Sequence, residues 1–318
     1  MTAGSIAKRD RFFGCLLGHA IGDAVGAPVE GMPATAIWYD MGGARKLVSD
    51  PTVEHLIYTD DTQMTIAVAE ALIAAGQADE QALCDAFVAN YEPGRGYGQG
   101  ARRIIEAMAD GGDWRRLAAT IFPGGSLGNG GAMRVAPIGL LFHDDLDHVA
   151  EQAAASARPT HLHPIGIDGA RLVALAVAIV VRDGVFDRER FYTELIGRAA
   201  TEEFRYQLER AARWTPSDPV GLFGSSLPAD RSVVTAIACF AATPRDYPAV
   251  LASAIALGDD TDTVAAIAGG ICGALNGVGV VPRRLLERLE DGPKGRRHIE
   301  SLALGLFDRY EQSATLRA

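Results

Sequence analysis

The sequence contains little cysteine and no excess of positive charge. Only four of the 318 residues are cysteines, with no CxxC pair and no zinc-type spacing. All four stand among apolar or small neighbours, so we expect buried, reduced thiols in a cytoplasmic protein. The net charge of −10 argues against non-specific nucleic-acid binding, which depends on basic residues. The negative net charge still permits binding of an anionic small ligand, because a metal or a helix N-terminus can make one site locally positive.

Long apolar runs are also lacking. The most apolar run, Leu172–Val181, lies between two arginines and has ten residues, too few to span a bilayer. The N-terminal stretch 1–13 has charged residues but no apolar core followed by a cleavage site, so it does not resemble a signal peptide. We expect no membrane association, and we expect 172–181 to form part of a buried central helix.

Alternating strand patterns are nearly absent, with one short candidate at 46–48. Glycine and proline follow the helical patterns at the places where helices should end. These features predict an all-α protein with a single domain over 1–318. The expected helices are 9–20, 62–76, 79–91, 99–110, 113–120, 131–142, 145–157, 165–183, 188–199, 202–213, 232–243, 246–256, 262–275, 282–289 and 296–312.

Two similar clusters of acids and threonines lie far apart in the chain, at 59–62 (Thr-Asp-Asp-Thr) and 259–263 (Asp-Asp-Thr-Asp-Thr). Each leads into an alanine-rich helical pattern. A single cluster of this kind is typical of a helix N-cap. Two matched clusters favour a metal centre, because crowded carboxylates repel one another unless protons or cations intervene. Carboxylate and hydroxyl oxygens are the ligands that magnesium, manganese and calcium prefer.

The segment 14–31 combines a glycine-faced helix with an acidic loop residue. Gly14, Gly18 and Gly22 share one helical face, which lets another element approach the backbone closely. Simple helix packing is sufficient to explain that face. Glu30 follows in a Gly/Pro loop, where no helix dipole or i,i+4 partner explains an acidic side chain, so it is a candidate for a functional role.

A glycine-rich segment, 124–131, precedes the helix expected at 131–142. Its unencumbered N–H groups beside a helix N-terminus suit a phosphate or pyrophosphate, although a flexible loop is the alternative. It is neither a Walker A loop nor a dinucleotide-binding GxGxxG. His161 and His163 lie at the start of the apolar helix. Histidines there could bind a metal, or they could form hydrogen bonds with the backbone or a ligand. We favour hydrogen bonding.

Together these segments resemble the ADP-ribosylglycohydrolase family over nearly the whole chain. The residues that carry the resemblance are Gly14–Glu30, Tyr58–Met64, Gly96–Gly100, Gly125–Val135, Thr160–His161 and Gly258–Thr263. The resemblance implies an all-α, compact orthogonal multi-helix bundle. It also implies a binuclear site with two Mg²⁺ (or Mn²⁺) at the base of a cleft for ADP-ribose.

The resemblance also implies roles for individual residues. The implied metal ligands are Thr59, Asp60, Asp61, Asp260, Asp262 and Thr263, with Asp262 bridging the ions and Asp259 an extra acid without an assigned role. Glu30 matches a mobile acidic residue that gates or assists the metal site. The expected catalytic residues are Glu30, Asp60, Asp61 and Asp262.

The glycine segment looks most like the branch that removes ADP-ribose from serine and cleaves O-acetyl-ADP-ribose. The implied substrate contacts are Gly125, Ser126, Gly128, Asn129, Gly130 and His161. One departure concerns Leu127, which stands where that branch often has an aromatic residue, and Phe122 is the candidate to replace it as a stacking surface. The arginine-directed and nitrogenase-reductase-directed branches share the metal motifs, so the linkage stays open.

The sequence therefore predicts a metal-dependent hydrolase that releases ADP-ribose from its partners. Those partners would be an ADP-ribosylated protein or a small molecule that contains ADP-ribose, and we expect the enzyme to be a monomer. The alternative is a non-catalytic ADP-ribose-binding or crystallin-like structural protein with the same fold. Substrate turnover distinguishes the two hypotheses.

Overall fold

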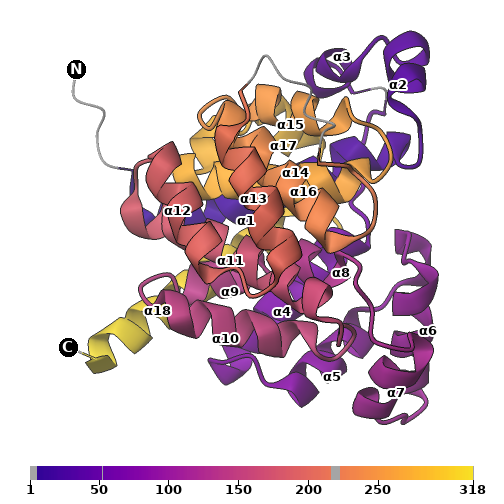
Figure 1. The fold of residues 1–318 in the computed structure, drawn as a ribbon, viewed down its shortest axis with the longest axis vertical. Helices are drawn as coiled ribbons and strands as arrows, with labels where there is room; N and C mark the ends of the chain where they lie inside the picture. The colour runs from indigo at the N-terminus through magenta and orange to yellow at the C-terminus, as the bar shows by residue number, and fades with distance from the viewer. Residues whose placement is uncertain (1–5, 52, 216–222, 318) are drawn as a thin grey trace.

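The regular elements of the computed structural model are helices, and no named strand occurs in the residues it describes, 6–51, 53–215 and 223–317 (Figure 1). The first part of the chain forms α1 (Lys8–Gly26), α2 (Ala34–Asp40), α3 (Ala44–Ser49), α4 (Asp60–Ala75), α5 (Glu80–Asn90), α6 (Gln99–Ala109), α7 (Trp114–Ile121), α8 (Gly130–Met133), α9 (Ala136–Leu141) and α10 (Leu146–Ala157). The remainder forms α11 (Pro164–Asp183), α12 (Arg188–Arg198), α13 (Glu202–Arg213), α14 (Ala229–Ala242), α15 (Tyr247–Ile255), α16 (Thr261–Asn276), α17 (Arg283–Arg288) and α18 (Arg296–Arg317). The all-α prediction is confirmed.

The glycine face of α1 packs directly on α16. A Cβ added to Gly14, Gly18 or Gly22 would collide with backbone carbonyl oxygens of α16. Because glycine permits this approach, the two helices pack backbone to backbone, and α1 continues to Gly26 rather than ending near residue 20 as the sequence predicts. The close packing places the end of α1 beside the start of α16.

The apolar helix α11 lies in the middle of the fold, as predicted. Its residues 172–181 are all buried, and all four cysteines are buried as well. The Nδ1 atom of His163 accepts a hydrogen bond from the N–H of Ile165 and caps the helix start, while Gly184 ends it in the left-handed conformation. By length and composition, α11 and the segment Lys8–Val29 could each cross a membrane, but 78% and 83% of their apolar windows are buried within the protein.

Two predictions of secondary structure, at 46–48 and at 131–142, are wrong. The candidate strand at 46–48 lies within helix α3, which packs against α15, so a three-residue alternation was too short to indicate a strand. The helix expected at 131–142 is divided into α8 and α9. Pro137 occupies the first turn of α9, where its missing N–H is tolerated, and it could not lie inside one continuous helix.

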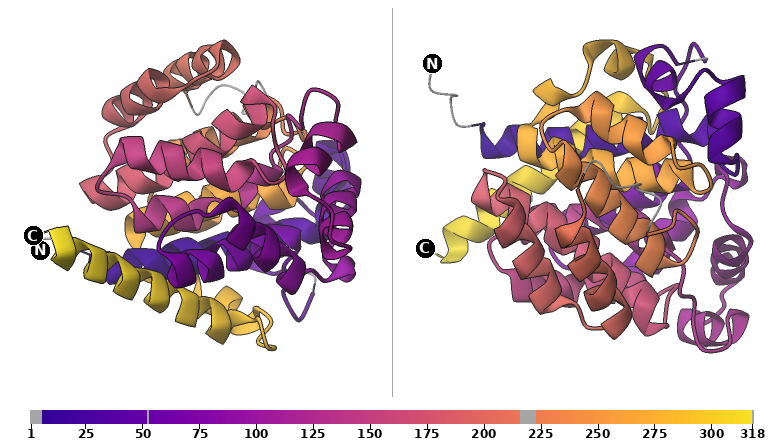
Figure 2. Two further views of the ribbon diagram at one scale, coloured as in Figure 1. Left: turned by 90° about the horizontal axis from the view of Figure 1, so that it is seen from below. Right: turned by 45° about the horizontal axis from the view of Figure 1, so that its top comes forward.

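The helices form layers around one hydrophobic core cluster, which includes residues from Phe12 to Tyr310. In the left view of Figure 2, α18 (yellow) lies along one side and the red helices of residues 188–213 lie on the opposite side. The helices α6 and α7 stand at the edge of the molecule in Figure 1. Residues of α6 and Ile121 of α7 line a cavity between these helices and the main body.

Candidate active site

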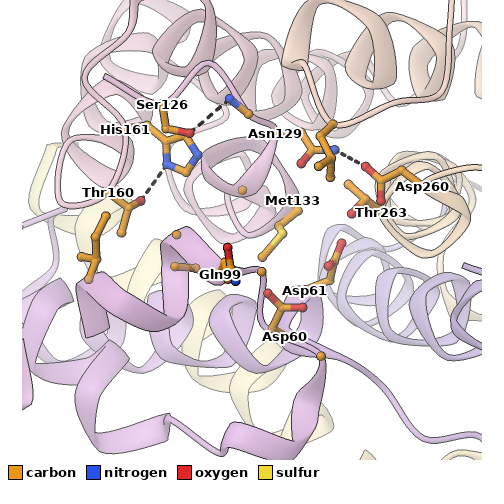
Figure 3. Close-up of a pocket in the computed structure, with 18 of the residues that line it drawn as sticks. Asp60, Asp61, Gln99, Ser126, Asn129, Met133, Thr160, His161, Asp260 and Thr263 are labelled. Atoms are coloured by element: carbon orange, nitrogen blue, oxygen red, sulfur yellow. Dashed lines mark hydrogen bonds between the residues drawn. The ribbon is translucent and has the colours of Figure 1, made fainter. Parts of the chain in front are cut away.

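A cavity of about 450 Å³ lies where α4, α6, the glycine-rich segment and α16 meet (Figure 3). Residues from both acid clusters and from the glycine-rich segment line it, although these segments are far apart in the sequence. The predicted site residues among its lining are Glu30, Asp60, Asp61, Ser126, Gly128, Asn129, Gly130, His161, Asp260, Asp262 and Thr263. Two predicted residues, Thr59 and Gly125, lie outside the lining.

The acid clusters meet because α4 and α16 both begin at this cavity. Asp60 and Asp61 form the first turn of α4, and Asp262 lies in the first turn of α16. Carboxylate oxygens of Glu30, Asp260 and Asp262 all lie within 4.8 Å of one another. The arrangement gathers acids from three separate segments at one end of the cavity.

A backbone pairing places Glu30 beside α16. The N–H of Gly31 donates to Asp259 O at 2.8 Å, and the N–H of Asp259 donates to Met32 O at 2.9 Å. Asp259 has a φ of 65°, which is rare for a residue other than glycine. The backbone of Asp259, rather than its exposed carboxylate, therefore helps to build the site.

Burial makes these carboxylates hard to ionise in the absence of a cation. Burial, and then the neighbouring charge of Asp23, together raise the pKa of Asp60 to about 8. Burial and then the facing charge of Asp262 hold the pKa of Asp61 well above its usual range. The pKa of Asp262 is likewise well above its usual range, because of burial and then the charge of Asp260. The cluster favours binding either protons or cations.

The residues fit a hard divalent cation. Asp61 Oδ1 is buried and has no hydrogen-bond partner among the described residues, so a carboxylate oxygen is left to be satisfied by something else. Asp60, Asp260, Asp262 and Thr263 line the same cavity and offer further carboxylate and hydroxyl oxygens, and no cysteine is among the lining residues. Such a set matches Mg²⁺ or Mn²⁺ better than zinc or copper.

Thr59 is hydrogen-bonded to Asp23, a residue for which the sequence predicted no role. Its backbone N–H and its hydroxyl both donate to Asp23 Oδ1, each at 2.9 Å, and the hydroxyl lies 3.5 Å from Asp61 Oδ2. Asp23 also accepts from the N–H and hydroxyl of Thr62, and burial raises its pKa to about 6. One feature of the sequence could have indicated a role for Asp23. It is an aspartate in the otherwise apolar stretch 20–25, and a buried carboxylate needs hydrogen-bond partners.

The glycine-rich segment turns sharply and forms one wall of the cavity. Gly125 has a φ of 85°, and a Cβ added there would collide with the backbone at His163, so it shapes the segment from outside the lining. The N–H of Gly128 donates to Ser126 Oγ at 3.3 Å, and the N–H of Asn129 donates to Leu227 O at 3.0 Å. These two N–H groups already have partners, and the helix that follows, α8, has only four residues. Because α8 is this short, its helix dipole contributes little to binding an anion here.

Asn129 links this wall to the acid cluster. Its side-chain nitrogen donates to Ser232 Oγ at 3.0 Å. The same nitrogen donates to Asp260 Oδ2 (Figure 3). Both amide hydrogens are thus engaged within the protein. Asn129 lines the cavity as predicted, but in this structure its amide orients Asp260.

His161 lines the cavity in a neutral state. Burial, and then the nearby charge of Arg134, lower the pKa of its imidazole to about 3. Its Nδ1 lies 2.7 Å from Thr160 Oγ1. Neither His161 nor His163 belongs to the acid group that could hold a metal.

The end of the cavity formed by α6 and α7 is more apolar. Ile104, Ile121 and Phe122 line it, and the Phe122 ring lies against Gly100, where an added Cβ would overlap it. Leu127 is exposed and does not line the cavity. A planar ring entering this end would meet Phe122 rather than Leu127.

Comparisons with known proteins identify the family. A family model described as ADP-ribosylglycohydrolase matches residues 5–315. The ADP-ribosylhydrolase ARH3 of Mus musculus is 33% identical, with 96% of this chain and 93% of that protein covered. ADP-ribosylhydrolase ARH3 of Homo sapiens is 32% identical, with 98% and 96% covered. A solved structure described as an ADP-ribosylglycohydrolase-related protein complex superposes with a TM-score of 0.72 at 26% identity, covering 95% of this chain and 99% of the other. The chain belongs to the ADP-ribosylglycohydrolase family and is a hydrolase of glycosidic bonds to ADP-ribose.

Proposed function

We propose that the protein is a divalent-metal-dependent hydrolase that cleaves the bond at C1″ of an ADP-ribosyl group and releases ADP-ribose. One observation carries the proposal: the carboxylates at the starts of α4 and α16, together with Glu30, occupy one end of the cavity whose wall is the glycine-rich segment. A ligand that fills this cavity would have one end at the acids and its other end near Phe122.

Two Mg²⁺ or Mn²⁺ ions are the proposed cofactors. The residues that would hold them are Thr59, Asp60, Asp61, Asp260, Asp262 and Thr263. Bound there, the cations would neutralise the carboxylates and lower the pKa of a coordinated water, which generates a nucleophile at neutral pH.

The surrounding residues hold this end of the cavity in shape. Asp23 fixes Thr59 through two hydrogen bonds to its N–H and hydroxyl, and Asn129 fixes Asp260. Glu30 lies among the acids but on an exposed loop, so its carboxylate can take up or deliver a proton at the reacting end. Burial, followed by the charge of Asp260, raises the pKa of Glu30, which suits proton transfer.

For the substrate we propose serine-linked ADP-ribose on proteins, or O-acetyl-ADP-ribose. Support comes from the glycine-rich segment, which resembles that branch of the family, and from relatives that carry the name ADP-ribosylhydrolase at 32–33% identity. The enzyme would act as a cytoplasmic monomer. Phe122 is the proposed stacking surface for the adenine end, since Leu127 lies outside the cavity.

A linkage panel tests the proposal. Purified protein with Mg²⁺ is incubated with serine-linked, arginine-linked and acetyl-linked ADP-ribose, and free ADP-ribose is quantified. We expect release from the serine and acetyl linkages. Release from the arginine linkage alone would reassign the substrate, and release from none would favour the non-catalytic, crystallin-like alternative.

A further inference from the structure

The environment of His161 determines which of its ring nitrogens carries a hydrogen. Arg134 is fully buried, and its Nη2 donates to Thr160 Oγ1 at 2.8 Å and to Ser156 O at 2.9 Å. A guanidinium has donors only, so Thr160 Oγ1 must be the acceptor in the first of these bonds. The guanidinium also lies over the Phe87 ring, 4.5 Å from its centroid, which holds it in place.

The hydroxyl hydrogen of Thr160 then has two acceptors within reach. Ala157 O lies 3.5 Å away and already accepts the backbone N–H groups of Thr160 and His161, at 3.1 and 2.9 Å. A carbonyl oxygen has two lone pairs, so this one is fully used. His161 Nδ1 lies only 2.7 Å from the hydroxyl and is the better acceptor by distance.

We propose that Arg134 and Thr160 are positioning residues that fix His161 as the neutral tautomer with its hydrogen on Nε2. Neither residue was predicted from the sequence to have a role. Arg134 determines the direction of the Thr160 hydroxyl, and Thr160 in turn leaves Nδ1 without a hydrogen. The chain of contacts runs from the core of the protein to the cavity wall.

The consequence is a permanent hydrogen-bond donor facing the glycine-rich segment. Cβ atoms added at Gly128 and Gly130 would lie 3.8 and 3.3 Å from His161 Nε2, which places this atom against the cavity wall. An N–H there selects for an acceptor on the ligand, such as a pyrophosphate or ribose oxygen. This step rests on the proposed function, whereas the tautomer itself does not.

The direct test is the tautomer in the ligand-free protein. Nitrogen-15 histidine labelling with long-range proton–nitrogen correlation distinguishes Nε2–H, Nδ1–H and doubly protonated rings. The chain has seven histidines, and comparison with His161→Gln assigns the signal of interest. We expect Nε2–H alone at neutral pH, with Nδ1 as the hydrogen-bond acceptor. An Nδ1–H or doubly protonated ring would overturn the proposal without affecting the proposed hydrolysis.

Two variants of Thr160 test the positioning role. Thr160→Val keeps the side-chain shape but removes the hydroxyl, so the Nδ1 signal should shift and ADP-ribose should bind about tenfold more weakly, the loss expected for one hydrogen bond. Thr160→Ser restores the hydroxyl and should restore both the Nδ1 signal and most of the affinity. If Val and Ser variants give the same histidine spectrum, Thr160 does not position the ring.

Discussion

The side-chain amide of Asn129 donates a hydrogen bond to the carboxylate of Asp260, joining the glycine-rich wall of the cavity to its acidic end. The two residues are 131 positions apart in sequence. Their contact means that a change in the glycine-rich segment can alter cation binding, and cation binding can alter the segment.

Replacing Asn129 should therefore weaken metal binding before any substrate is present. In Asn129→Ala the Asp260 carboxylate loses a donor that orients it, and we expect Mn²⁺ to bind about 10-fold more weakly, as for other partners of metal ligands. Mn²⁺ titration monitored by calorimetry measures this. Ser232→Ala is the matched control, because it removes the other amide contact of Asn129 but leaves the bond to Asp260. Equal Mn²⁺ affinity in Asn129→Ala and wild type, with weaker ADP-ribose binding, would mean that Asn129 contacts the substrate instead.

Stability of the metal-free protein should fall as the pH rises. Burial raises the pKa of Asp60 to about 8 in the folded state, whereas an aspartate in the unfolded chain titrates near pH 4. The folded state thus binds the proton of Asp60 more tightly than the unfolded chain does. Protonation of Asp60 therefore contributes its whole stabilising free energy below about pH 4, and this contribution is lost as the pH rises towards 8. Differential scanning fluorimetry at pH 5 and pH 8, with chelator or with Mg²⁺, should show a larger Mg²⁺-induced rise in Tm at pH 8. A Tm unaffected by Mg²⁺ at both pH values would argue against a cation at these acids.

Asp262→Ala should separate stability from activity. Removing one buried carboxylate relieves repulsion, so the metal-free variant should melt at or above the wild-type temperature at pH 8. Turnover should fall by about two to three orders of magnitude, because cation-dependent stabilisation is worth several kcal/mol. Thermal melts and steady-state kinetics on one preparation measure both quantities. A large fall in Tm would instead indicate that Asp262 is structural.

Gly128→Val should affect substrate binding more than the chemical step. A Cβ at this position meets only ordinary contacts, the nearest being Ser126 Oγ at 3.4 Å, so the fold should survive. The added methyl groups enter the cavity and obstruct the ligand in the ground and transition states alike, which raises KM with less effect on kcat. Gly128→Ala is the control for the loss of glycine. A fall in kcat alone would place this residue at the reacting end.

The sequence predicted the fold class and most of the cavity, because helical periodicity and the two acid clusters are local signals. The break at Pro137 was a local signal that the helix prediction at 131–142 overlooked, since proline cannot lie inside a continuous helix. The backbone role of Asp259 could not be predicted, because it depends on pairing with Gly31 and Met32, which lie far away in the chain. Asp23 was missed for the same reason: nothing in its neighbourhood in sequence indicates the two threonines that it holds. The hydrogen bond from Asn129 to Asp260 could not be predicted either, because the two residues lie far apart in the chain.

Glu30→Gln keeps the shape of the side chain and removes its charge. If Glu30 transfers a proton at the reacting end, kcat should fall by about 10²- to 10⁴-fold, the usual contribution of general acid–base catalysis. ADP-ribose binding should persist or tighten, because a negative charge leaves a site for an anionic ligand. Single-turnover kinetics and an ADP-ribose titration measure the two effects. An unchanged kcat with a lower Tm would mean that Glu30 only stabilises its loop.

Metal-dependent turnover tests the central claim most directly. Chelated wild-type protein is given serine-linked ADP-ribose, first without a divalent cation and then with added Mg²⁺ or Mn²⁺, while release of ADP-ribose is followed over time. We predict no release above background in the chelated protein and rapid release once either cation is added. Equal release with and without the cations would contradict the account, since the acids of α4 and α16 would then have no role in the reaction.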